Sequence, residues 1–309
     1  MIPATTGPRR VTGMAAILLP YRGDGTIDWL AFEAHVARTV AAGLVAAVNM
    51  DTGYVQLLGE DDRRRALEIA ADVCPGAFVA GAYVGDGPGA SFDLDGYRRA
   101  ATEICAQGGT PVVFPSHGLN ALDDEGWVEA VGLIGKEVDR FIGFELGPMF
   151  VPYGRIVGID AYRALLGIPS CVGAKHSSLS RQDEWERLAL RDDVRPEFLV
   201  LTGNDRAIDM IMWGSDYLLG LATFAPEEFA RRDACWASGD PRFFELNDVL
   251  QYLGAFAFRD PVPAYRHDAA MVFELRGWAS SDATPPGAPR RPSSDRAVLA
   301  AIVEQLASS

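Results

Sequence analysis

The feature that most constrains the fold is an alternation of short apolar runs with amphipathic stretches along most of the chain. Eight apolar runs recur at roughly 30-residue spacing, which suits the strand–helix unit of a barrel. Near-continuous apolar strands that alternate with helices indicate a parallel sheet covered on both faces, and eight units predict a closed (β/α)8 TIM barrel. The runs lie at residues 13–20, 43–50, 77–83, 110–115, 141–146, 171–175, 198–202 and 217–222.

An open, doubly wound parallel sheet is the alternative architecture. Such a sheet often carries a glycine-rich turn after its first strand, and the third glycine of that turn lies where a helix opens. Here the turn reads PYRGDGTID at residues 20–28, with no helix start at the third glycine position. The turn therefore favours the barrel.

After residue 225 the strand pattern stops, and stretches with helical periodicity dominate the sequence. Residues 279–295 are rich in Pro, Ser and Gly, a composition that favours an extended connector. A last helix is predicted over the segment DRAVLAAIVEQLAS at 295–308. We therefore predict two regions, a barrel at residues 1–225 and a C-terminal helical region at residues 226–309.

Charge and composition argue against several classes of protein. The formal net charge of −14 does not suit a nucleic-acid binder, whose footprint is a basic patch. The four cysteines stand far apart without a C-x-x-C pair, so we expect reduced and mostly buried thiols. No apolar run reaches the ~18 residues that a membrane helix needs, and the N-terminus lacks a long apolar segment. We expect a cytoplasmic protein that binds neither nucleic acid nor membrane.

Polar residues follow nearly every apolar run, and in a (β/α)8 barrel the reactive groups lie at these strand ends. Histidines and carboxylates are scattered among them rather than clustered, so a metal-dependent enzyme is a weak alternative and we predict no metal site. The polar residues at the ends of the apolar runs are Tyr21, Asp51-Thr52-Gly53, Tyr83, Ser116-His117, Glu145, Lys175-His176, Asn204-Asp205 and Thr223.

Lysine is nearly absent from this chain. Only two of the 28 lysine and arginine residues are lysines, Lys136 in a helical stretch and Lys175 at the end of the sixth run. Arginine stays protonated in proteins, whereas a lysine in an apolar wall can lose its proton and act as a nucleophile. The position of Lys175 therefore favours a nucleophile. The alternatives are a lysine that reaches solvent and a lysine that pairs with Glu145.

Five segments carry a resemblance that runs over nearly the whole chain. They are DTGYVQLLGEDDRRRALEIA after the second run, FPSHG after the fourth, GAKHSS at the sixth, LTGND at the seventh and PPGAPRRPSSDRAVLAAIV near the end. In this order they resemble the dihydrodipicolinate synthase and N-acetylneuraminate lyase family of class I aldolases. The most specific motif is the family's G-x-K followed by a polar pair, which carries the Schiff-base lysine, here Lys175. The resemblance also implies a homotetramer or homodimer and chemistry without a cofactor.

The turn after the second run departs from the family pattern. The family has a G-T-T-G-E turn that holds the substrate carboxylate, and this chain reads Met50-Asp51-Thr52-Gly53-Tyr54. We predict that Thr52 and Gly53, with the backbone N–H groups of the turn, bind the carboxylate, because successive free amides form an anion site. An ordinary strand-to-helix turn is the alternative. Because Asp51 would repel a carboxylate, we expect it to point away, unless the ligand is not the usual 2-oxo acid.

The relay tyrosine that the family places after the fifth strand is missing. This chain has Met149 or Phe150 at that place, so another group must carry protons to the Schiff base. Tyr153 is the nearest phenol in sequence and is our candidate, and a surface-loop tyrosine is the alternative. Arg155 follows a proline much as a substrate-binding arginine of the family does, and a solvated surface charge is its alternative.

Two histidines flank strand ends. Ser116 and His117 replace a tyrosine pair of the synthase branch, and His117 is a candidate acid or base because imidazole titrates near neutrality. A hydrogen-bonded structural histidine is the alternative. His176 follows Lys175 directly, and neighbours along a strand point to opposite faces. If Lys175 faces the barrel interior, His176 therefore faces the helices.

These residues predict a Schiff-base-forming lyase, an aldolase or dehydratase, that acts on a 2-oxo acid such as pyruvate or a keto-deoxy sugar acid. Lys175 forms the imine, which stabilises the carbanion next to the former carbonyl. The main alternative is a non-catalytic or regulatory ligand-binding relative that keeps the barrel and the lysine but has lost the proton relay.

Overall fold

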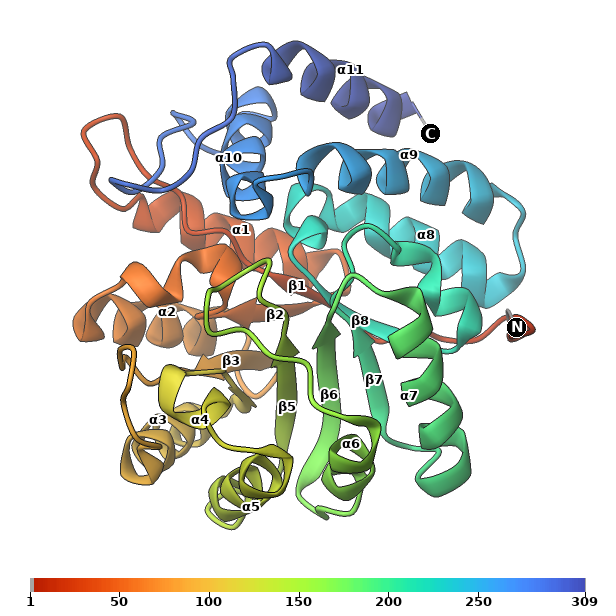
Figure 1. The fold of residues 1–309 in the computed structure, drawn as a ribbon. Coiled ribbons are helices and arrows are strands. Elements are labelled where there is room, and N and C mark those ends of the chain that lie inside the picture. Colours follow the sequence, from red (N-terminus) through yellow and green to blue (C-terminus); the bar gives the residue numbers. More distant parts are fainter. Residues whose placement is uncertain (1–2, 309) are drawn as a thin grey trace.

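The computed structural model of the chain describes residues 3–308 and forms a closed barrel of eight parallel strands (Figure 1). Each strand pairs with its neighbours in sequence, and β1 closes the barrel against β8. This confirms the predicted (β/α)8 TIM barrel. The strands are β1 (Gly13–Ala16), β2 (Val45–Val48), β3 (Phe78–Ala82), β4 (Thr110–Val113), β5 (Phe141–Leu146), β6 (Cys171–Ser177), β7 (Leu199–Thr202) and β8 (Asp216–Leu219).

The strands separate two apolar cores because successive side chains of a strand point to opposite faces. On β1, Met14 and Ala16 belong to the core inside the barrel, whereas Ala15 belongs to the larger core between strands and helices. The inner core also contains Phe114 and Phe144, whose rings pack edge to face. The barrel is therefore a packed core, and polar side chains become accessible only at its ends.

Helices cover the outer face of the barrel, and several begin at side chains that accept a hydrogen bond from the first turn. Asp28, Asp93, Asp123 and Ser180 are such N-caps. After β7 a short 3-10 helix, Ile208–Trp213, takes the place of an α-helix. The α-helices from the start of the chain to the one that follows β8 are α1 (Trp29–Ala41), α2 (Glu60–Val73), α3 (Leu94–Ala106), α4 (His117–Asn120), α5 (Asp124–Gly135), α6 (Ile159–Leu166), α7 (Arg181–Val194) and α8 (Pro226–Ser238).

The C-terminal region is helical, as predicted, and lies along one side of the barrel. It contains α9 (Arg242–Ala257), α10 (Tyr265–Leu275) and α11 (Asp295–Ser308). Figure 1 shows these helices together beside α1 and α8, and α10 also contacts the segment that follows β8. The division after residue 225 stays a prediction, and α8, which lies beyond it, packs against α1 and β1.

All four cysteines are unpaired, and their exposure differs. Cys74 and Cys171 are buried, Cys235 is partly buried and Cys105 is exposed. Among residues 3–308, no helix combines the length and the apolar character that a bilayer span requires.

Candidate active site

Strand β6 places Lys175 in the inner layer of the barrel. Its register partners are Phe144 on β5 and Leu201 on β7, and both belong to the inner core. Lys175 is only 4% exposed, and its Nζ lies 4.5 Å from the centroid of the Phe144 ring. A Cβ atom at Gly203 would lie 2.9 Å from Lys175 Cε, so glycine at that position leaves room for the side chain. The structure thus puts a buried amine at the C-terminal end of the barrel.

Asp51 faces this amine. Its Oδ1 lies 3.7 Å from Lys175 Nζ, and its Oδ2 accepts a hydrogen bond of 3.0 Å from the Tyr265 hydroxyl of α10. Arg266 donates to the Asp51 carbonyl at 3.0 Å. The expectation that Asp51 points away is therefore wrong. Attraction to the ammonium and the Tyr265 hydrogen bond together hold the carboxylate toward the site.

Thr52 and Gly53 form a short 3-10 helix with Asp51 at the end of β2. The Thr52 side chain is fully buried, and its Oγ1 lies 2.8 Å from the Tyr265 hydroxyl. Because Tyr265 has one hydroxyl hydrogen and donates it to Asp51, Thr52 donates to Tyr265. The Thr52 hydroxyl is therefore already engaged. The first N–H groups of the turn have no acceptor within the short helix.

A second carboxylate, Asp205, follows β7 near the same amine. Its Oδ1 accepts a hydrogen bond of 2.7 Å from the Leu221 N–H, and the residue is 4% exposed. Burial raises the pKa of Asp205 to about 7, against the lowering effects of the Leu221 N–H and the Lys175 ammonium. The site therefore contains a buried amine, a carboxylate that faces it and a second buried carboxyl group that interacts with both electrostatically.

Tyr153 and His117 lie together on another side of the barrel mouth. Their ring centroids are 4.2 Å apart, and Asp86 anchors the start of α4 by accepting from the His117 and Gly118 N–H groups. Burial raises the pKa of the Tyr153 phenol well above its usual value, and nearby Tyr83, Asp86 and Asp51 raise it further. The phenol therefore stays protonated. Whether Tyr153 and His117 act in catalysis stays a prediction.

Arg155 ties the connection between β5 and α6 to the barrel's outer ring. Its guanidinium pairs with Asp124 of α5 and donates to the Leu122 carbonyl, and its own N–H donates to the Leu146 carbonyl at 2.6 Å. Figure 1 shows this connection crossing the end of the barrel. The structure thus gives Arg155 a structural partner, and a contact with substrate stays a prediction.

His176 faces the helices, as predicted from its place beside Lys175. Its Nδ1 lies 2.9 Å from Glu145 Oε2, and its Nε2 lies 2.7 Å from the Ser178 hydroxyl. Arg187 of α7 makes a two-pronged ion pair with the same Glu145 carboxylate, with distances of 2.6 and 2.8 Å. Glu145 therefore serves this buried network and does not pair with Lys175.

Two curated proteins are similar to the chain over most of its length. The 4-hydroxy-tetrahydrodipicolinate synthase of Kosmotoga olearia is 25% identical over 233 residues, 73% of this chain and 75% of the relative. The 4-hydroxy-tetrahydrodipicolinate synthase of Hyphomonas neptunium is 24% identical over 258 residues, 81% of this chain and 84% of the relative. No protein-family model matches the chain.

Solved structures agree in fold. A monomeric dihydrodipicolinate synthase variant has a TM-score of 0.81 at 17% identity and covers 96% of each chain. The dihydrodipicolinate synthase of Acinetobacter baumannii, in complex with pyruvate, has a TM-score of 0.77 at 18% identity and covers 96% of this chain and 99% of its own. A prophage protein of the same family from E. coli K12, also in complex with pyruvate, has a TM-score of 0.79 at 14% identity and covers 96% of this chain and 98% of its own.

The resemblance to the dihydrodipicolinate synthase family is confirmed. Within that family pattern, Asp51 stands where the carboxylate-binding turn has its first threonine. A residue that departs from the family pattern is thus the one that faces Lys175.

The sequence does not predict the part that three residues play in this site. Tyr265 and Arg266 lie on α10, more than 200 residues after the turn that they contact. The periodicity of the segment predicts a helix, but it does not say where that helix docks. The sequence predicts that Asp205 lies at a strand end, but only the structure brings it close enough to Lys175 and Asp51 to interact with them electrostatically.

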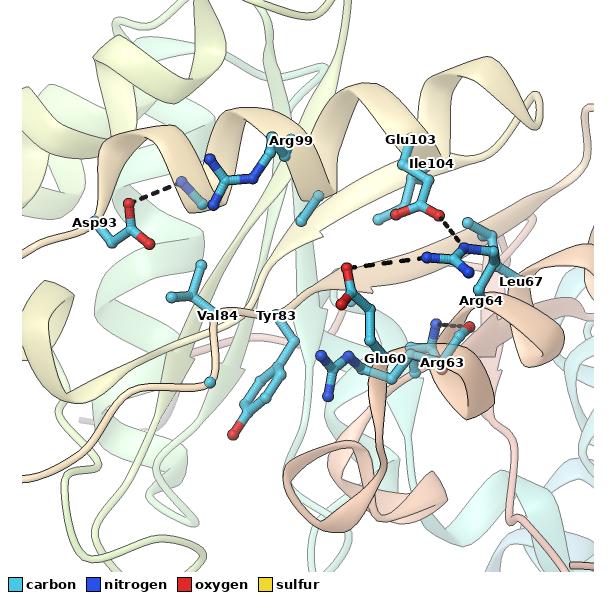
Figure 2. A pocket seen from close by; sticks show the side chains of 15 residues that line it. Glu60, Arg63, Arg64, Leu67, Tyr83, Val84, Asp93, Arg99, Glu103 and Ile104 are labelled. Atoms are coloured by element: carbon cyan, nitrogen blue, oxygen red, sulfur yellow. Dashed lines mark hydrogen bonds and ion pairs between the residues drawn. The ribbon is translucent and has the colours of Figure 1, made fainter.

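A separate cavity of about 510 Å³ lies between α2 and α3, outside the strands (Figure 2). Arg64 in its wall pairs with Glu60 and Glu103, and Tyr83 lines the side nearest β3. Lys175 does not line this cavity, so we place the candidate site at the barrel mouth. Among residues 3–308, no three His, Cys, Asp or Glu side chains are gathered as a metal ion would require.

Proposed function

We propose that the protein is a Schiff-base-forming lyase of the class I aldolase type that acts on a 2-oxo acid such as pyruvate or a keto-deoxy sugar acid. The observation that carries the proposal is the buried Lys175 amine at the C-terminal end of the barrel, beside a carboxylate. The similarity to 4-hydroxy-tetrahydrodipicolinate synthases supports it, as do structural neighbours in complex with pyruvate.

In this mechanism the neutral Lys175 amine attacks the substrate ketone, and loss of water gives a protonated imine. The imine withdraws electrons as a C–C bond forms or breaks, or as water is eliminated. The first N–H groups of the Asp51–Gly53 turn are the proposed site for the substrate carboxylate, with the charge of the Asp51 side chain offset by the Lys175 ammonium that it faces. Tyr153 and His117 are the proposed acid–base groups on another side of the mouth. Arg155 is the proposed substrate-binding arginine, and its ion pair with Asp124 also holds the loop that carries Tyr153.

A ligand-binding relative without turnover is the second candidate. The observation that favours it is the apolar pair Met149 and Phe150 at the place of the family's relay tyrosine. For either candidate we propose a cytoplasmic homotetramer or homodimer, on the basis of the resemblance alone.

The test is borohydride trapping with pyruvate and other 2-oxo acids, followed by peptide mapping. Because Lys136 is the only other lysine, the expected result is a mass increase on the Lys175 peptide alone. Lys175→Arg should abolish trapping and turnover, since a guanidinium stays protonated and cannot attack. Lys136→Arg is the matched control and should trap normally. An adduct on Lys136, or no adduct with any 2-oxo acid, would refute the lyase proposal, and trapping without turnover would favour the ligand-binding relative.

A further inference from the structure

We propose that Asp51 is the proton carrier for Schiff-base chemistry at Lys175, in place of the absent tyrosine. The inference rests on the proposed function and adds to it the group that exchanges protons with the reacting nitrogen. The evidence is that one oxygen of the buried Asp51 carboxylate is hydrogen-bonded, whereas the other oxygen, which faces Lys175, accepts no hydrogen bond from the described residues.

One oxygen of Asp51 is held in place. Oδ2 accepts from the Tyr265 hydroxyl at 3.0 Å, and the Thr52 hydroxyl, 2.8 Å away, donates to Tyr265 in turn. Arg266 fixes the backbone of the same residue through the Asp51 carbonyl at 3.0 Å. Burial and the nearby Asp51 carboxylate raise the pKa of Tyr265 well above its usual value, so this phenol is a fixed donor.

The other oxygen is free to react. Asp51 is 7% exposed, and its Oδ1 accepts no hydrogen bond from any residue between 3 and 308. This oxygen faces Lys175 Nζ at 3.7 Å. A buried carboxylate oxygen with no hydrogen-bond donor usually costs free energy, because it has lost its hydration without replacement. Here that oxygen is the one aimed at the nucleophile, and proton exchange needs the 3.7 Å gap to close to about 2.6–3.2 Å, or to be bridged by one water, when substrate binds.

The rival phenol suits this role less well. Burial raises the pKa of Tyr153 well above its usual value, and Tyr83, Asp86 and Asp51 add to the effect. Near neutral pH Tyr153 therefore can donate a hydrogen bond but is a poor proton acceptor. Asp51 starts as the partner of an ammonium, so it can accept a proton from Lys175 at the outset of the reaction.

The protons balance in this scheme. Lys175 in its ammonium form carries three N–H protons, and Asp51 takes one of them so that the neutral amine can attack the ketone carbon. The N–C bond forms, and the carbonyl π electrons move to oxygen. Asp51 then delivers its proton to that oxygen, takes a second proton from nitrogen and delivers it as well. The C–O bond breaks and water leaves. The product is a protonated imine with one N–H beside an ionised Asp51, so the total charge is unchanged.

The experiment measures the rate at which saturating pyruvate forms the imine, by rapid quenching into borohydride. Asp51→Asn keeps an oxygen for Tyr265 and removes the proton acceptor, so we expect the rate to fall ~10²–10⁴-fold, the usual range for general acid–base catalysis. Asp205→Asn removes the other buried carboxyl group near Lys175 and should slow imine formation far less than Asp51→Asn. Asp72→Asn, at an exposed position of α2, is the control that should leave the rate unchanged. If Asp51→Asn and Asp205→Asn lower the rate of imine formation equally, the two carboxylates act only through their charge near Lys175, and the proposal is overturned.

Chemical rescue gives a second readout that a purely structural role would not change. In Asp51→Ala, added formate should restore imine formation in proportion to its concentration, whereas Asp51→Asn leaves no space for formate and should not respond. Normal trapping by Asp51→Asn, or an Asp51→Ala variant that traps slowly and ignores formate, would refute Asp51 as proton carrier while Lys175 chemistry still stood. If the wild type forms no adduct, the proposed function itself fails.

Discussion

Lys175 and His176 are neighbours on β6, yet their side chains lie in opposite chemical surroundings. Lys175 lies beside the Phe144 ring and one carboxylate, whereas His176 is hydrogen-bonded on both ring nitrogens within a buried network. The two-residue period of a strand predicts this division from sequence. The orientation of Asp51 was not predictable, because it depends on a hydrogen bond from Tyr265, which is distant in sequence.

The Tyr153→Phe variant separates two steps of the proposed reaction. If Asp51 serves imine formation, the Tyr153 phenol serves a later step as a donor to substrate oxygen. We therefore expect turnover to fall at least ~10²-fold while the trapping rate with pyruvate changes little. Stopped-flow turnover and quenched trapping on the same preparation measure the two rates. Tyr252→Phe, an exposed tyrosine on α9, is the control. Unchanged turnover would remove Tyr153 from the mechanism and direct attention to Tyr83 and His117.

Strands were easier to predict than their ends. The apolar run at residues 141–146 coincides with β5 (Phe141–Leu146), but the run at 13–20 continues beyond β1 (Gly13–Ala16). Ile17, Leu18 and Leu19 lie beyond the strand and are nevertheless buried in the larger apolar core between strands and helices. Apolar character reports burial, whereas strand bounds depend on backbone pairing.

The contact between β5, β6 and α7 depends on the buried Glu145–Arg187 pair. Glu145→Gln leaves the buried Arg187 without its counter-charge, so we expect a loss of about 3–5 kcal/mol in the free energy of unfolding, measured in urea. Replacing both partners, Glu145→Leu with Arg187→Met, should cost less than the single change, because no unpaired charge remains buried. A single variant as stable as the wild type would contradict this role.

The same pair predicts a pH dependence. Burial alone would raise the pKa of Glu145, but His176 and the Arg187 guanidinium outweigh it and lower the pKa to about 2. A carboxyl group with a lowered folded-state pKa contributes its full stabilisation above its unfolded value of about 4.3 and loses it as the pH falls. The stability difference between wild type and Glu145→Gln should therefore be constant above about pH 4.5 and shrink toward pH 2. A difference that grows on acidification would contradict the assignment.

At the scale of the whole molecule, one helix of the C-terminal region, α10, is part of the candidate site. Helix α10 brings Tyr265 and Arg266 onto the turn after β2, where they hold Asp51 and Thr52. The sequence predicts both the barrel and the helical region, but periodicity carries no information on which face of the barrel a later helix covers. The boundary between the two regions is therefore not a functional boundary.

Tyr265→Phe tests this connection. The change removes the hydroxyl that orients Asp51 and leaves the ring stacked on Phe258, so the free energy of unfolding should fall by about 1–3 kcal/mol, because Thr52 and Asp51 lose a buried hydrogen-bond partner. Imine formation should slow, but less than in Asp51→Asn, because the proton carrier is misplaced rather than lost. The double variant Tyr265→Phe with Asp51→Asn should be no slower than Asp51→Asn alone, since Tyr265 acts through Asp51. Tyr252→Phe again serves as the control. If the fold losses in the rate of imine formation of the two single variants multiply in the double variant, α10 acts on the reaction by a route other than Asp51.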